Sequence, residues 1–117
     1  MTNKPSSAQP IIETSAEACT TMAEVRAGVD AIDRALVALL GQRMRFIEAA
    51  ARIKPTRDQV RDEWRKADVL AKVRVEAAAH GFPPALAEAV YEVLVEGSIA
   101  HEFERFDRRA LQQQPAD

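Results

Sequence analysis

The chain has 117 residues and a formal net charge of −2, which argues against bulk nucleic-acid binding because phosphate contacts need a basic face. Its 22 alanines, 4 glycines, 6 prolines and 5% aromatic residues favour helices over sheets in a single domain. The single cysteine excludes an internal disulfide, and no apolar run reaches the roughly 18–20 residues of a membrane-spanning helix.

Both ends of the chain are polar. Residues 1–19 contain Pro and Ser among polar side chains, so we expect a flexible N-terminal tail. This segment lacks the apolar centre of a secretory signal, so we expect a cytoplasmic protein. Residues 111–117 are expected to form a frayed C-terminal tail.

The first helix is expected to begin at Thr20 or Thr21, because Glu24 follows Thr21 at the spacing of a capping box. It is expected to run to about Lys54, since Pro55 disfavours helical geometry at the residue before it. At 1.5 Å per residue, such a helix extends for ~50 Å.

Two shorter helices are expected to follow. The second covers roughly 58–79 and stops at a His-Gly pair, which is a helix C-cap signal. A Pro-Pro pair then opens the third helix, which runs to about Arg109. The three helices together form an all-helical domain over residues 20–110.

Apolar residues recur along the first helix at alternating spacings of four and three, the pattern of a coiled-coil face. We call this face the apolar stripe, and its members are Val25, Val29, Ile32, Leu36, Leu39, Phe46, Ala50 and Ile53. Two shorter helices cannot easily cover a stripe of this length. We therefore expect a partner helix, most simply from a second copy of the chain in a symmetric dimer.

Three cations accompany the stripe. Arg43 occupies a stripe position where Leu is expected, and it either extends into solvent or faces an internal cavity and pairs with an anion. Lys54 points to nearly the same side, although a cation at a helix C-terminus is also favourable by itself. Arg26 lies ~42 Å from Lys54 along one helix, so these two could share a small ligand only between antiparallel helices of a dimer.

The third helix carries a polar pair, Ser98 and Glu102, spaced four residues apart on one face. Either the pair belongs to a site, or it forms a solvated edge where Glu102 bridges to Arg105. His101 is expected at the surface. The His and Cys residues have no metal-ligand spacing, and the sequence has no Gly-rich phosphate loop and no nucleophile elbow.

The run EVRAGVDAIDRALVALLGQRMRFIEAAARIK resembles the first helix of the all-helical chorismate mutase family, with its early Arg, Ile-Asp pair, apolar heptads, later Arg and final Lys. The segments RDEWRKADVL and VEGSIAHE resemble the start of the second helix and the last active-site segment of that family, so the resemblance covers about residues 22–106. It implies an intertwined homodimer whose active sites draw on both chains. It also implies rearrangement of chorismate to prephenate without a cofactor or a metal.

The resemblance implies a role for each cation of the first helix toward a dianionic substrate. Arg26 would bind a carboxylate across the dimer interface, and Arg43 would bind the enolpyruvyl carboxylate. Lys54 would bridge that carboxylate and the ether oxygen, where negative charge grows as the bond breaks. Holding both carboxylates would also select the compact, reactive conformer.

The resemblance extends to the later helices, with two departures. Arg65 corresponds to a further lining arginine, Ser98 to a residue beside the ring carboxylate, and Glu102 to the second group at the ether oxygen. Many bacterial mutases have Gln at the Glu102 position, and an ionised Glu cannot donate a hydrogen bond to that oxygen. We therefore expect turnover to be favoured at mildly acidic pH. Lys66 stands where mutases place a Glu that recognises the ring hydroxyl.

Two alternatives remain beside the mutase. The lead-in Cys19-Thr20 and the RIK ending of the first helix resemble the branch of the family that converts isochorismate to salicylate and pyruvate, whereas Ser98 resembles the mutases. We favour the mutase, and an enzyme with both activities stays open. The other alternative is a non-enzymatic helical dimerisation module, in which the stripe is an interface and every charge is solvated. No nucleic-acid or membrane partner is expected.

Overall fold

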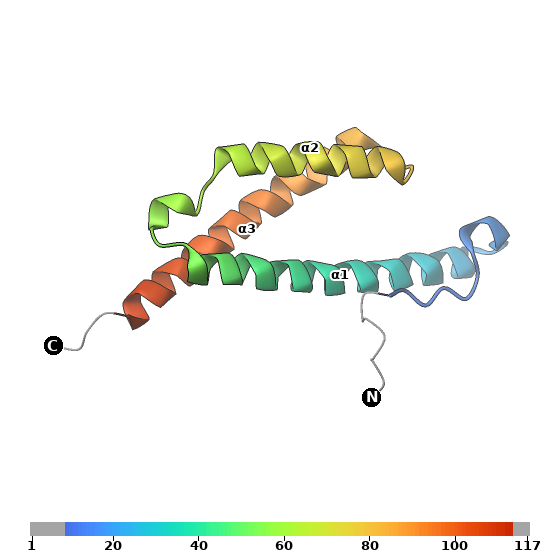
Figure 1. Cartoon of the computed structure of the whole chain (residues 1–117). Coiled ribbons are helices and arrows are strands. Elements are labelled where there is room, and N and C mark those ends of the chain that lie inside the picture. Colours follow the sequence, from blue (N-terminus) through green and yellow to red (C-terminus); the bar gives the residue numbers. More distant parts are fainter. Residues whose placement is uncertain (1–8, 114–117) are drawn as a thin grey trace, which may run out of the picture. The chain divides into compact units, whose positions relative to one another are not determined.

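The computed structural model describes residues 9–113. This range contains three α-helices and two short 3-10 helices, and no strand. Figure 1 shows the elements in chain order: η1 (Ala16–Ala18), α1 (Met22–Ile53), η2 (Arg57–Gln59), α2 (Glu63–Ala79) and α3 (Pro84–Gln112). The expected all-helical class is confirmed. Within the same residues, no helix combines the length and the apolar character needed to cross a membrane.

The expected capping box starts α1. The backbone N–H of Thr21 donates to Oε1 of Glu24 at 3.1 Å, and the N–H of Glu24 donates to Oγ1 of Thr21 at 3.2 Å. The backbone N–H of Thr20 reaches the same carboxylate at 3.0 Å. Hydrogen bonds from the Thr20 backbone and then the Thr21 side chain lower the pKa of Glu24. The helix ends at Ile53, as the following proline predicts.

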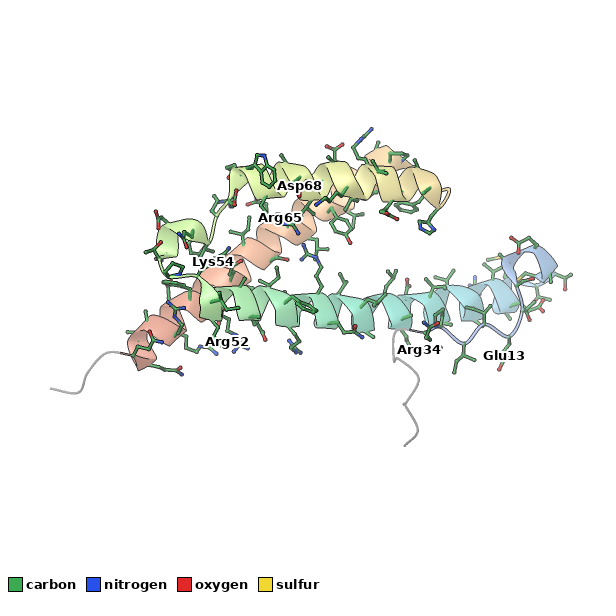
Figure 2. All side chains as sticks on the ribbon, in the orientation of Figure 1. Glu13, Arg34, Arg52, Lys54, Arg65 and Asp68 are labelled. Atoms are coloured by element: carbon green, nitrogen blue, oxygen red, sulfur yellow. The ribbon has the colours of Figure 1, made fainter. Side chains whose placement is uncertain are left out.

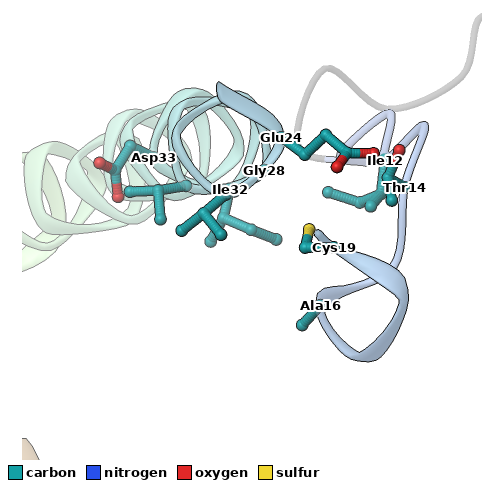
Figure 3. A pocket seen from close by; sticks show the side chains of 10 residues that line it. Ile12, Thr14, Ala16, Cys19, Glu24, Gly28, Ile32 and Asp33 are labelled. Atoms are coloured by element: carbon teal, nitrogen blue, oxygen red, sulfur yellow. The ribbon is translucent and has the colours of Figure 1, made fainter. Parts of the chain in front are cut away.

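The chain divides into two compact units, residues 1–45 and 46–117. In the first unit, part of the segment expected to be a tail forms η1 and lines a cavity of about 450 Å³ against α1. Figure 3 shows Ile12 and Cys19 facing Gly28 and Ile32 across this cavity. Residues 1–8 lie outside the described part of the chain.

The apolar stripe is uncovered in the single chain. Its large members are all exposed, from 38% at Val25 to 77% at Phe46. Monomeric proteins rarely expose a contiguous apolar face of this extent, because water solvates it poorly. That the stripe packs against a second polypeptide stays a prediction.

The core of the second unit lies where η2 and α2 pack against α3. Its buried residues are Ala51, Val60, Val95, Ile99 and Phe106. Val95, Ile99 and Phe106 recur on one face of α3 at helical spacing, and that face also carries Glu102. The apolar core and the polar candidate therefore share one side of the helix.

The second helix begins later than the expected position near residue 58. The side chain of Asp62 accepts a hydrogen bond from the backbone N–H of Arg65 at 3.0 Å, so Asp62 is the N-cap and α2 starts at Glu63. Val60, just before the cap, is 2% exposed within the core. The burial of Val60 in the core and the N-cap conformation of Asp62 both require a non-helical connection between η2 and α2.

The turn between α2 and α3 follows the predicted signals. Gly81 has φ of +69°, a left-handed conformation that glycine adopts without steric cost. The N–H of Phe82 donates to the carbonyl of Ala77 at 2.9 Å, which completes a Schellman motif. Pro84 then occupies the first turn of α3, and the helix continues to Gln112. Residues 111 and 112, expected to fray, are thus helical, and residues 114–117 lie outside the description.

Ion pairs fasten the start of α2 to α3. Glu96 on α3 accepts from Nη2 of Arg61 at 2.6 Å and from Nζ of Lys66 at 2.8 Å. Lys66 also reaches Glu92 at 2.5 Å. Hydrogen bonds from Arg61 and then Lys66 lower the pKa of Glu96 to about 2.

This network predicts a specific pH dependence of stability. Because the pKa of Glu96 lies near 2 in the folded protein and a free Glu has its ordinary pKa of 4.5, the contribution of Glu96 to stability is complete above pH 4.5 and is lost as the pH falls toward 2. We expect the melting temperature of Glu96→Gln to depend less on pH in this window than that of the wild type. The melting temperature is measured by circular dichroism from pH 6 to pH 2. The control is Glu104→Gln, since Glu104 pairs with Arg108 on its own helix. Identical pH profiles for the two variants would contradict the assignment.

Candidate active site

The candidate site centres on an ion pair between Lys54 and Glu102. Lys54 follows the last residue of α1, and its Nζ lies 2.7 Å from Oε2 of Glu102 on α3 and donates to the carbonyl of Val60 at 3.3 Å. The Glu102 side chain is 6% exposed and the Lys54 side chain 28%. The solvated-edge interpretation of Glu102 is therefore wrong. Arg105, its expected surface partner, lies 3.2 Å from Glu48 instead.

The Glu102 carboxylate keeps unused hydrogen-bonding capacity. Its Oε2 finds no partner with hydrogen-bond geometry among residues 9–113, although the Lys54 ammonium is close enough for an ion pair. A carboxylate oxygen can accept more than one donor, and a buried polar atom without a hydrogen bond is costly for the folded state. A buried polar atom of this kind in a native fold marks a candidate functional site.

Ser98 lies on the same face of α3, one turn before Glu102. The residue is 3% exposed, and its Oγ donates to the carbonyl of Leu94 at 2.7 Å. The expected polar pair is thus buried rather than solvated. Two buried polar side chains among apolar neighbours are uncommon on a structural helix.

Arg65 and Lys66 take different positions at the start of α2. Arg65 is 58% exposed, and its Nη1 donates to Oδ2 of Asp68 at 2.8 Å on the same helix. Figure 2 shows the two side chains next to each other on α2. Hydrogen bonds from Lys72 and then Arg65 lower the pKa of Asp68. The Lys66 side chain is only 16% exposed because it is held by the acidic residues of α3 described above.

The other two candidates belong to the first unit. Arg26 is exposed in the early turns of α1. Arg43 is half-buried on the same helix, at the stripe position that the pattern assigns to Leu. That Arg26 and Arg43 join Lys54 in one pocket stays a prediction.

The sequence did not indicate the residues around the site that join α1 to α3. His101 was expected at the surface, but it is half-buried and its Nε2 lies 2.8 Å from Oε2 of Glu48, so that expectation is wrong. Arg105, one turn after His101, contacts the same carboxylate. Their spacing of four residues places them on one face, but nothing local to α3 identifies the acidic partner on α1.

The connection after Lys54 is also fixed to α3. Nε of Arg57 donates to Oδ1 of Asp107 at 2.9 Å, and its guanidinium lies 4.5 Å from the ring centroid of Phe103. The hydrogen bond from Arg57 lowers the pKa of Asp107. Together with buried Val60, these contacts hold the segment that carries Lys54 in place.

The chemistry available to this arrangement is electrostatic. A partly desolvated ammonium attracts an anion more strongly than an ammonium in bulk water, and it can stabilise an oxygen on which negative charge develops. Within residues 9–113, no group of three or more His, Cys, Asp or Glu side chains is arranged to hold a metal ion.

Comparison with known proteins agrees with this chemistry. A family model described as Chorismate mutase type II matches residues 25–103, a stretch that contains all six candidate site residues. An isochorismate pyruvate lyase from Pseudomonas aeruginosa is 29% identical over 86 residues, which cover 74% of this chain and 85% of the relative. The resemblance seen in the sequence is confirmed, and the chain belongs to the chorismate mutase type II family.

Proposed function

We propose that the chain is a chorismate mutase, which rearranges chorismate to prephenate. The observation that carries this proposal is the position of Lys54, whose ammonium lies 2.7 Å from the buried carboxylate of Glu102 within the region matched by the family model. These are the two residues expected at the ether oxygen. Their proximity supports a shared role there.

The proposed mechanism uses electrostatic stabilisation rather than covalent chemistry. Bond breaking precedes bond making, so negative charge grows on the ether oxygen in the transition state. Lys54 stabilises the transition state, which carries this charge, more strongly than it stabilises the ground state, and this difference lowers the barrier. The ion pair of its Nζ with Glu102 and its hydrogen bond to the Val60 carbonyl restrict the ammonium beforehand, so little reorganisation is needed during the reaction.

The substrate is a dianion, and the remaining candidates would hold its two carboxylates. We assign Arg43 to the enolpyruvyl carboxylate, Arg65 to the cationic lining and Ser98 to the neighbourhood of the ring carboxylate. Arg26 would come from a second copy of the chain in a homodimer with shared active sites. The exposed apolar stripe supports such a dimer, because association would remove it from water.

The second candidate function is cleavage of isochorismate to salicylate and pyruvate. Two observations favour it. The relative from Pseudomonas aeruginosa is an isochorismate pyruvate lyase. In addition, the expected acidic residue for the ring hydroxyl is replaced by Lys66, whose ammonium is bound to Glu92 and Glu96.

Separate incubation with chorismate and with isochorismate tests both candidates. Prephenate from chorismate supports the mutase, whereas salicylate and pyruvate from isochorismate support the lyase. A chain that converts neither substrate contradicts both and favours the non-enzymatic helical dimerisation module.

Removal of the Lys54 charge is expected to lower kcat by about 10²–10³, as for loss of one donor to a developing oxyanion. The variant is Lys54→Met, which keeps the length of the side chain, and kcat is measured on whichever substrate the wild type converts. Lys72→Met is the matched control, since the Lys72 side chain is 67% exposed and pairs with Asp68 on its own helix. Equal kcat values for the two variants would exclude the assigned role.

Ligand binding separates the enzyme from the helical module. A bicyclic dicarboxylate that resembles the transition state is expected to raise the melting temperature of the wild type, because a ligand of the folded state stabilises it. Arg43→Ala should remain folded and lose most of this shift. Arg34→Ala, an exposed arginine on the same helix, should keep it. Absence of any shift in the wild type would favour the module.

The pH profile tests the role of Glu102. A protonated Glu can donate to the ether oxygen and an ionised Glu cannot, whereas Gln donates at every pH. We expect Glu102→Gln to move the optimum of kcat/KM, measured from pH 5 to pH 9, to a higher pH than that of the wild type. Glu104→Gln, an exposed neighbour, should keep the wild-type profile. An unchanged profile for Glu102→Gln would refute a donor role.

A further inference from the structure

The end of α1 is capped by an arginine from α3. The last carbonyls of a helix have no partner within it, and a basic side chain near the C-terminus can bind them. Nη1 of Arg109 donates to three such carbonyls, those of Ala51 at 3.0 Å, Arg52 at 2.7 Å and Lys54 at 3.0 Å. One guanidinium nitrogen thus gathers the final turn of α1 and the residue that follows it.

Arg109 is itself held tightly and at a cost. Its guanidinium lies 4.4 Å from the ring centroid of Phe106, which is 7% exposed in the core beside Ala51. Its Nε is buried and has no hydrogen-bond partner within the described part of the chain. Burying that donor is unfavourable, so the bonds of Nη1 to α1 are what offsets it. An arginine that served only to make the surface polar would not be half-buried with an unpaired Nε.

The spacing along α3 relates Arg109 to the candidate site. Glu102 and Arg109 are seven residues apart, which is two helical turns, with Phe106 on the same face between them. Glu102 contacts the Lys54 ammonium, and Arg109 binds the Lys54 carbonyl. One face of α3 therefore holds Lys54 by its side chain and by its backbone.

We propose that Arg109 is a positioning residue, which fixes the end of α1 and thereby sets the place of the Lys54 ammonium. Lys54 lies just beyond the helix, where the chain turns toward Pro55, and a residue there has more backbone freedom than one inside α1. The hydrogen bond from Arg109 to the Lys54 carbonyl removes this backbone freedom. The consequence for catalysis rests on the proposed function, since preorganised charge stabilises a transition state only if it is held in register.

The test compares Arg109→Ala and Arg109→Lys with the wild type. Lys keeps the charge but ends one atom short of the position of Nη1 and lacks the planar group that stacks on Phe106, and it serves if the Ala variant does not fold. The matched control is Arg108→Ala, because Arg108 is exposed and pairs with Glu104 on its own helix. Two quantities are measured. The first is amide exchange at Lys54, whose N–H donates to Ala50 at 2.9 Å, and the second is the pair kcat and KM.

We expect Lys54 amide exchange to become about tenfold faster in both Arg109 variants and unchanged in the control, since opening of the final turn exposes that N–H. We expect kcat to fall about tenfold and KM to rise by less, because Lys54 would hold a carboxylate in both states but meet the developing charge of the ether oxygen only in the transition state. Millimolar guanidinium should restore part of kcat to Arg109→Ala. A general loss of folded protein would not give this rescue.

Each outcome decides the proposal. Exchange and kcat equal to those of Arg108→Ala overturn it, and so does faster exchange with unchanged kcat. Faster exchange with a guanidinium-rescued loss of kcat supports it. If the wild type converts neither chorismate nor isochorismate, the proposed function fails. Amide exchange at Lys54 then still shows whether Arg109 fixes the end of α1.

Discussion

The rest of the second unit depends on a charge pair that is largely removed from water. Taking Lys54 and Glu102 out of solvent costs free energy, and removing one partner would leave the other charge uncompensated. The pair is therefore stable only inside a frame that keeps both groups in register. Buried Val60 and the capped end of α1 supply that frame on one side, and the core face of α3 supplies it on the other.

The core face of α3 combines packing and charge. Val95, Ile99 and Phe106 fill the apolar core, while Glu102 and Arg109 occupy the same helical spacing and reach Lys54. A rigid helix fixes the separation of its side chains far better than a loop does. The two polar groups thus take their precision from the apolar residues that pack on the same face of the helix.

Local signals in the sequence were sufficient for most helix limits. The capping box at Thr21, the glycine at the end of α2 and Pro84 each act over a few residues, so their effects could be predicted directly. The start of α2 was missed because burial of Val60 is a tertiary event that overrides helix propensity.

The candidate site was predictable only in part. The periodicity brought Lys54 and Glu102 to attention as charges on apolar faces, and the resemblance to a family related them to each other. His101 with Glu48, and Arg109 with the end of α1, could not be found in this way. Those partners lie more than fifty residues apart, and no local pattern encodes which helix faces which.

The environment of Lys66 constrains how this sequence can diverge. Its ammonium is bound to two carboxylates of α3, so an acidic side chain in its place would bring three negative charges together. A single exchange to Glu would therefore be disfavoured, even where that acid improved recognition of a ring hydroxyl. We therefore expect an acid at position 66 to be tolerated better once Glu92 or Glu96 has lost its charge, so the three positions are coupled.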